Sequence, residues 1–196
     1  MSSRQLLLIR HGLSALDPPP GLLALADIEC WRDAYNVTGI APHSQPPSHL
    51  VTAVGGADML AASDLPRAIE SAGRLAPGRA VTTLPVFREF DLTIPRWSAC
   101  PMPFTAWAVL VHLRWAMDIL GRRDAPPEVA ARAGEAAAWC HDACLGSTSG
   151  GAVAVVTHGA FRRLLAKQLV RDGWRPSAAR RSYAHWSVWR FDLPAR

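Results

Sequence analysis

Short apolar runs alternate with amphipathic segments along the chain. The apolar runs predict strands at residues 5–9, 59–63, 80–87, 152–157 and 187–191. The intervening segments predict helices at residues 28–35, 48–55, 64–76, 104–121, 126–146 and 160–172. Strands that alternate with helices are typical of a layered α/β fold. We therefore expect a three-layer αβα sandwich, in which helices cover both faces of a mostly parallel central sheet.

Two loop-rich stretches, at residues 13–50 and 90–125, interrupt this alternation. The first contains Trp31 and Tyr35, whose side chains favour burial, so it is not a simple linker. The length of 196 residues, 49% of them hydrophobic, fits one domain with a sizeable core. We expect a single domain over residues 1–196, with the two stretches as its cap segments.

The formal net charge of +5 favours anionic ligands such as phosphates. Arginine supplies nearly all of the positive charge, because Lys167 is the only lysine. The arginines are spread along the chain, without a basic tail or a nucleic-acid-binding motif. We therefore expect no nucleic-acid partner.

The sequence shows no signal-peptide pattern, and charged residues interrupt its longest apolar stretch, residues 104–120. We expect a cytoplasmic protein with no membrane partner and with reduced cysteines. Cys140 and Cys144 lie four residues apart on a predicted helix, where they are either metal ligands or small apolar residues of a core. No second ligand pair occurs at zinc-site spacing, so we favour core residues and expect no metal.

Residues with ligand-binding chemistry follow three of the predicted strands, and one of them, Arg67, lies in the first turn of the next helix. These residues are Arg10, His11, Gly12, Arg67, His158 and Gly159. If the three strands are neighbours, their carboxyl ends bring two imidazoles and two guanidiniums to one edge of the sheet. Glycine after each histidine allows a ligand to approach the backbone, and helix N-termini attract anions. Such a set of groups suits a phosphoryl group.

Four motifs occur in a fixed order along most of the chain. They are RHG at residues 10–12, SDLPRAIESA at 63–72, REF at 88–90 and THG at 157–159. With these motifs the chain resembles the histidine phosphatase superfamily, whose members have the phosphoglycerate-mutase-like fold. The phosphatase branch is the better match, because the longer substrate-binding segments of the glycolytic mutases are missing.

The resemblance implies a role for each matched residue. His11 would be the nucleophile that accepts the phosphoryl group as a phosphohistidine. Arg10, Arg67 and His158 would bind the phosphate oxygens, and Glu89 would protonate the leaving group. Adjacent guanidinium charges favour a neutral, nucleophilic imidazole, and they supply the countercharge that makes a metal or cofactor unnecessary.

The chain departs from the family pattern after the RHG motif. Leu13 stands where glutamate is common, and Asp17 stands where an asparagine normally contacts the phosphate. An aspartate there would repel phosphate, so a non-catalytic phosphate- or phosphoprotein-binding module is the alternative to a phosphatase. A phosphomutase is a third and weaker alternative.

The expected partner is a small phosphorylated substrate or a phosphoprotein. Trp31, Trp97 and Trp107 suggest an apolar mouth and a substrate with an apolar or aromatic portion. The sequence does not predict the oligomeric state. Five histidines match no motif and are interpreted as surface or structural residues: His43, His49, His112, His141 and His185.

Overall fold

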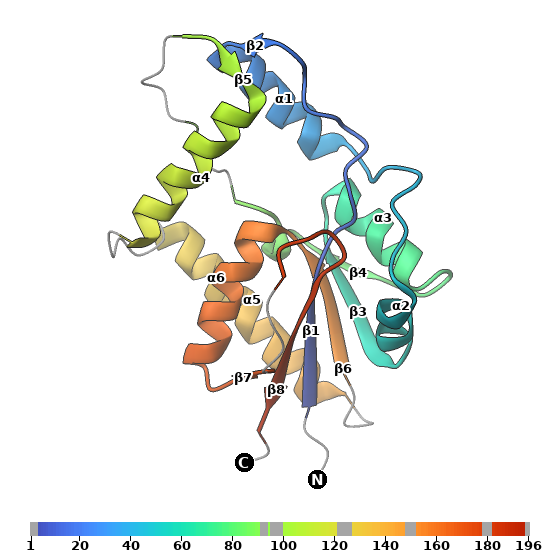
Figure 1. Cartoon of the computed structure of the whole chain (residues 1–196). Coiled ribbons are helices and arrows are strands. Elements are labelled where there is room, and N and C mark those ends of the chain that lie inside the picture. The colour runs from blue at the N-terminus through green and yellow to red at the C-terminus, as the bar shows by residue number, and fades with distance from the viewer. Residues whose placement is uncertain are drawn as a thin grey trace.

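A six-stranded sheet forms the centre of the computed structural model, which describes residues 4–90, 94, 100–120, 127–147, 152–177 and 182–194 (Figure 1). The strands are β1 (Arg4–Arg10), β3 (Ala57–Ser63), β4 (Thr82–Leu84), β6 (Ala152–Thr157), β7 (Arg175–Pro176) and β8 (Val188–Leu193). Their order across the sheet is β4-β3-β6-β1-β8-β7. The first four strands of this order are parallel, whereas β8 runs antiparallel to β1 and β7 antiparallel to β8. The expected mostly parallel sheet is confirmed.

Helices cover both faces of the sheet. On one face lie α5 (Pro127–Gly146) and α6 (Gly159–Arg171), and on the other lie α2 (Ser48–Gly55) and α3 (Pro66–Leu75). Side chains of β1 alternate between the two resulting cores: Leu6 and Leu8 pack with α5 and α6, and Leu7 and Ile9 pack in the other core. A strand buried on both faces explains the continuous apolar run at the start of the chain.

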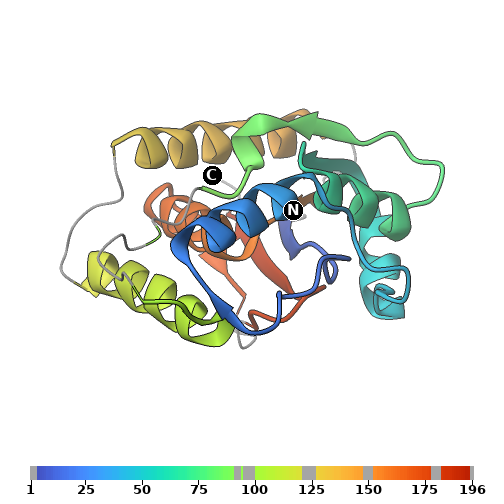
Figure 2. The same ribbon diagram turned by 90° about the horizontal axis from the view of Figure 1, so that it is seen from above.

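Four further elements lie at the end of the sheet where the parallel strands finish. They are β2 (Leu22–Leu23), α1 (Leu25–Val37), β5 (Met102–Pro103) and α4 (Phe104–Leu120). β2 pairs with β5, and the view from above shows α1 over this end of the sheet and α4 to one side of it (Figure 2). Leu23, Ile28 and Trp107 form a small buried core beneath them, in which the Trp107 indole N–H donates to the Leu23 carbonyl at 2.9 Å.

Several boundaries differ from the sequence-based expectations. The expected strand at 80–87 is three residues long and is followed by a 3₁₀ helix, Pro85–Phe87. Pro85 lacks the N–H that a longer strand would need for pairing. The expected helix at 28–35 is longer in the structure, where α1 extends from Leu25 to Val37.

The cysteine pair on α5 faces the core. Cys140 and Cys144 are both fully buried against the sheet, and burial raises the pKa of each thiol, to about 11 for Cys144. Within the described part of the chain, no three His, Cys, Asp or Glu residues are grouped so that they could hold a metal ion. No helix there is both long and apolar enough to cross a membrane.

Candidate active site

The neighbouring strands β1, β6 and β3 bring the first and last motifs together. Arg10, the last residue of β1, pairs with Thr157, the last residue of β6, so that the next residue of each chain segment is a histidine. The rings of His11 and His158 are 5.0 Å apart, centroid to centroid. The backbone N–H of His11 also donates to the Thr157 carbonyl at 3.1 Å. The expected meeting of the two histidines at one sheet edge is therefore what the structure shows.

His11 is 2% exposed, and one of its ring nitrogens is hydrogen-bonded to the backbone. Its Nδ1 lies 2.7 Å from the carbonyl oxygen of Gly12. Because a carbonyl only accepts hydrogen bonds, Nδ1 carries the hydrogen and Nε2 keeps its lone pair. Burial, and then the positive charge of Arg67, lower the pKa of His11 well below its ordinary value. The imidazole is therefore held in the neutral form that a nucleophile requires.

Gly12 lies in tight packing beneath this histidine. A Cβ added at Gly12 would lie 2.8 Å from Ser44 Oγ and nearer still to the Trp186 ring. The Gly12 N–H donates to Ser71 Oγ at 2.9 Å. Only glycine fits there, so the site requires the glycine of the RHG motif for packing.

Arg67 is held between the sheet edge and helix α1. Its side chain is 1% exposed, and its Nη1 donates to the Tyr35 carbonyl at 2.8 Å. The guanidinium carbon lies 4.3 Å from the centroid of the Tyr35 ring, a cation–π contact. Tyr35 in turn stacks on Trp31, which contacts Phe104 of α4. The cap segments therefore position Arg67.

Arg10 approaches the start of α6. Its Nη1 donates to the carbonyl of Tyr183. A Cβ at Gly159 would lie 3.4 Å from Arg10 Nε, so the second glycine of the expected site leaves room for this guanidinium.

His158 is the N-cap residue of α6 and is 1% exposed. Its Nε2 lies 2.9 Å from Ser63 Oγ at the end of β3. Burial, followed by the neighbouring His11 and Arg67, lowers its pKa well below the ordinary value.

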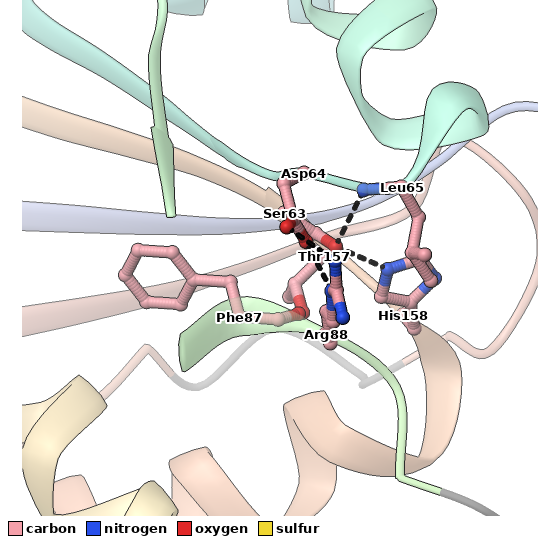
Figure 3. Close-up of polar contacts among 7 residues, drawn as sticks. All are labelled: Ser63, Asp64, Leu65, Phe87, Arg88, Thr157 and His158. Atoms are coloured by element: carbon pink, nitrogen blue, oxygen red, sulfur yellow. Dashed lines mark hydrogen bonds and ion pairs between the residues drawn. The ribbon is translucent and has the colours of Figure 1, made fainter. Parts of the chain in front are cut away.

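A polar network joins the ends of β3 and β6 to the segment that carries Glu89 (Figure 3). Arg88 forms a bidentate ion pair with Asp64, at 2.5 and 2.6 Å. Thr157 Oγ1 donates to the Phe87 carbonyl at 2.8 Å. The SDL and REF motifs are thus linked directly, and this link brings Glu89 to the N-terminus of α6.

The Glu89 carboxylate accepts hydrogen bonds from the first turn of α6. The N–H groups of Ala160 and Phe161 donate to it at 3.0 and 2.7 Å. Burial of the carboxyl raises its pKa, although these donors and the positive charge of Arg67 act in the opposite direction. Glu89 therefore keeps its proton to a higher pH than an exposed glutamate does.

Three buried nitrogen atoms of this cluster have no hydrogen-bond partner among the described residues: Arg10 Nε, Arg67 Nε and His158 Nδ1. Buried polar groups are normally hydrogen-bonded, so the cluster suits a ligand with several acceptor oxygens. A tetrahedral oxyanion such as a phosphoryl group has this chemistry.

The structure also corrects the expectation for Trp107 and shows where His185 lies. His185, interpreted from the sequence as a surface or structural residue, lies with its ring centroid 5.5 Å from that of His11. Trp107 is buried in the core of the cap and does not line a mouth. Trp97 and the side chain of His112 lie outside the described part of the structure.

Among the other unmatched histidines, His43 and His49 are exposed, and His141 packs edge-on against Trp174. Asp17 is exposed, and its backbone carbonyl accepts a hydrogen bond from Trp31 at 3.1 Å. Leu13 is exposed as well, while its N–H donates to Ser44 Oγ.

Comparison with known proteins identifies the family of the chain. The model of the histidine phosphatase superfamily (branch 1) matches residues 48–193, and the chain belongs to this superfamily. The matched region contains Arg67, Glu89 and His158, whereas the RHG motif precedes it. Comparison with curated protein sequences gave no significant match.

Solved structures share the fold at low sequence identity. A phosphoserine phosphatase from Entamoeba histolytica, in complex with 3-phosphoglyceric acid, is 16% identical with a TM-score of 0.55, over 86% of this chain and 80% of that one. A mycobacterial glucosyl-3-phosphoglycerate phosphatase is 21% identical with a TM-score of 0.56, over 86% and 80%. The product of an open reading frame from Mycobacterium tuberculosis is 18% identical with a TM-score of 0.56, over 98% and 96%. These similarities establish the phosphoglycerate-mutase-like fold.

Proposed function

We propose that this protein is a metal-independent phosphatase that hydrolyses phosphate monoesters through a phosphohistidine intermediate on His11. The observation that supports this most strongly is a buried, neutral imidazole with a free Nε2 beside the guanidiniums of Arg10 and Arg67, whose buried Nε atoms have no hydrogen-bond partner among the described residues. A nucleophile and an oxyanion-binding set are the two components that phosphoryl transfer requires.

In the first step, the Nε2 lone pair of His11 attacks phosphorus. The P–N bond forms, and the bond from phosphorus to the ester oxygen breaks. Protonated Glu89 donates its proton to the departing oxygen. Arg10, Arg67 and His158 stabilise the charge on the other phosphoryl oxygens.

In the second step, water attacks the phosphorus of the phosphohistidine. The ionised Glu89 takes a proton from the water, and the P–N electron pair returns to Nε2 of His11. Inorganic phosphate leaves, with both residues restored to their starting protonation states. The Gly12 carbonyl holds the Nδ1 hydrogen throughout, which favours the cationic ring of the intermediate.

The proposed substrate is a small phosphorylated molecule or a phosphoprotein. Tyr35 contacts Arg67, Trp31 stacks on Tyr35, and Phe104 meets Trp31 edge to face. These aromatic residues of the cap favour a substrate whose phosphate adjoins an apolar or aromatic portion. A cytoplasmic location is part of this proposal.

The proposal is tested with p-nitrophenyl phosphate in the presence of EDTA at mildly acidic pH. We expect turnover by wild type and by the control His49→Asn, an exposed histidine of α2, and none by His11→Ala. A phosphoenzyme that is labile in acid and stable in base identifies the intermediate in wild type.

Equal turnover by His11→Ala and wild type would refute the proposal. No turnover by either protein, together with thermal stabilisation by phosphate, would instead favour the phosphate-binding module. This alternative has to be tested because Leu13 and Asp17 depart from the family pattern after the RHG motif.

A further inference from the structure

A segment that the family motifs do not include, residues 182–187, lies directly against the nucleophile. His185 of this segment places its Nδ1 3.2 Å from the backbone carbonyl oxygen of His11, and its ring centroid 5.5 Å from that of His11. Because the carbonyl only accepts, Nδ1 of His185 carries the hydrogen and Nε2 keeps a lone pair. In the neutral form of His185 the nitrogen that can gain a proton is therefore Nε2, beside the expected position of the phosphoryl group.

The backbone of this segment is strained next to His185. Trp186 has φ 61°, the only positive φ of a non-glycine residue among the described residues. Its N–H donates to the Arg10 carbonyl at 3.2 Å, and its indole N–H donates to Ser44 Oγ at 3.0 Å. Such strain persists only where surrounding contacts enforce it, and it occurs preferentially at functional sites. These contacts fix His185 at the nucleophile.

A buried arginine fixes both ends of the same segment. Arg162 of α6 is fully buried and donates to the carbonyls of Ser187 and Ser182, at 2.7 and 3.0 Å. It also donates to Ser187 Oγ at 3.0 Å. Two independent sets of contacts therefore hold His185 in one place.

Several charged or titratable groups of the described part of the structure lie around His185. Arg10 at the end of β1 and His11 directly after it face His185, Arg162 holds its segment from α6, and Tyr183 lies within the segment. Burial and the guanidinium of Arg10 lower the pKa of His185, while its bond to the His11 carbonyl raises it. A dianion bound beside Arg10 would reverse this balance, because negative charge favours the protonated imidazole.

We propose that His185 is a third histidine of the phosphoryl site, which gains a proton as the phosphoryl dianion binds and donates from Nε2 to one of its oxygens. This inference rests on the proposed function, because it requires that the cluster around His11 binds a phosphoryl group. It makes ligand binding at this site proton-linked in the pH range where histidines titrate.

The test measures proton uptake when tungstate binds. Tungstate serves as the tetrahedral dianion because it does not itself titrate near neutral pH, whereas phosphate does. Isothermal titration at about pH 7, in buffers of different ionisation enthalpy, gives the number of protons taken up per tungstate. The test variant is His185→Asn, whose amide nitrogen can replace Nδ1 at the His11 carbonyl but cannot gain a proton.

We expect wild type and the control His49→Asn to take up a fraction of a proton per tungstate, and His185→Asn to lose most of that uptake. Tungstate affinity of wild type is expected to rise as the pH falls, and that of His185→Asn to rise much less. If His185→Asn does not fold, as judged by circular dichroism, His185→Gln is measured in its place with the same expectation.

Undiminished uptake by a folded His185 variant would overturn the inference and leave the proposed function standing. Binding by wild type without any uptake would do the same. Failure of wild type to bind tungstate at all would overturn both proposals.

Discussion

The rings of His11 and His158 lie 5.0 Å apart, centroid to centroid, yet a different ring nitrogen makes the hydrogen bond in each. Nδ1 of His11 is bound to the Gly12 carbonyl, whereas Nε2 of His158 is bound to Ser63 Oγ. This leaves Nε2 of His11 and Nδ1 of His158 for a ligand. In the proposed mechanism, His11 supplies a lone pair to phosphorus and His158 binds a phosphoryl oxygen.

The first prediction concerns Ser63, which orients His158. Ser63→Ala removes the hydroxyl at 2.9 Å from Nε2 and leaves the imidazole in place. A neutral hydrogen bond contributes about 1 kcal/mol, so we expect kcat to fall roughly 2- to 10-fold. His158→Asn removes a ligand of the transferring group, and we expect a larger loss, about 10²- to 10³-fold. Steady-state kinetics with p-nitrophenyl phosphate measures both losses. Equal losses in the two variants would contradict the prediction that His158→Asn is the more damaging change.

The second prediction is an acidic pH optimum. Burial raises the pKa of Glu89, so the general acid is protonated to a higher pH than an exposed glutamate and is lost as the pH rises further. Burial and Arg67 lower the pKa of His11 well below its ordinary value of about 6.5, so the nucleophile stays neutral in mild acid. We expect kcat/KM to fall from mildly acidic to neutral pH.

Glu89→Gln provides the control for this profile. It removes the titrating acid, so the decrease toward neutral pH should disappear. The loss should reach about 10²- to 10⁴-fold for an alkyl phosphate, the range for general acid catalysis, and be smaller for p-nitrophenyl phosphate, whose leaving group needs little protonation. Equal losses on the two substrates would show that Glu89 does not protonate the leaving oxygen.

The sheet and the meeting of the motifs could be predicted from local sequence. The apolar run from Leu6 to Ile9 is buried on both faces, which is the pattern of a central parallel strand. Such strands end at one edge of a sheet, so the histidines that follow two of them must lie close together. Pro66 at the first position of α3 likewise follows from the fixed φ of proline.

The contributions of His185 and Tyr35 could not be predicted, because each depends on how distant segments return to the site. His185 reaches His11 only because β8 runs antiparallel beside β1, and no spacing in the sequence encodes that pairing. The one available signal was its position just before the last predicted strand. Tyr35 contacts Arg67 because α1 lies over the sheet end, a tertiary arrangement that an amphipathic pattern does not specify.

The third prediction concerns Gly12. Gly12→Ala places a methyl group 2.8 Å from Ser44 Oγ and against the Trp186 ring, so the loop below His11 must move. We expect a loss of about 1–3 kcal/mol in the free energy of unfolding, the usual range for overpacking, together with reduced activity. Gly55→Ala is the matched control, since its Cβ meets nothing within 4 Å and alanine favours a helix. Urea denaturation of both variants measures the difference, and equal stability would contradict the close packing.

The fourth prediction separates the two contacts between Tyr35 and Arg67. Tyr35→Leu removes the ring 4.3 Å from the guanidinium but keeps the backbone carbonyl that accepts from Nη1. A cation–π contact contributes about 0.5–2 kcal/mol, so KM for a phosphate monoester should rise roughly 2- to 30-fold. Because the guanidinium is retained for the transferring group, kcat should change less. Tyr35→Phe keeps the ring and should behave as wild type, so an equal rise of KM in this variant would show that the hydroxyl, and not the ring face, holds Arg67.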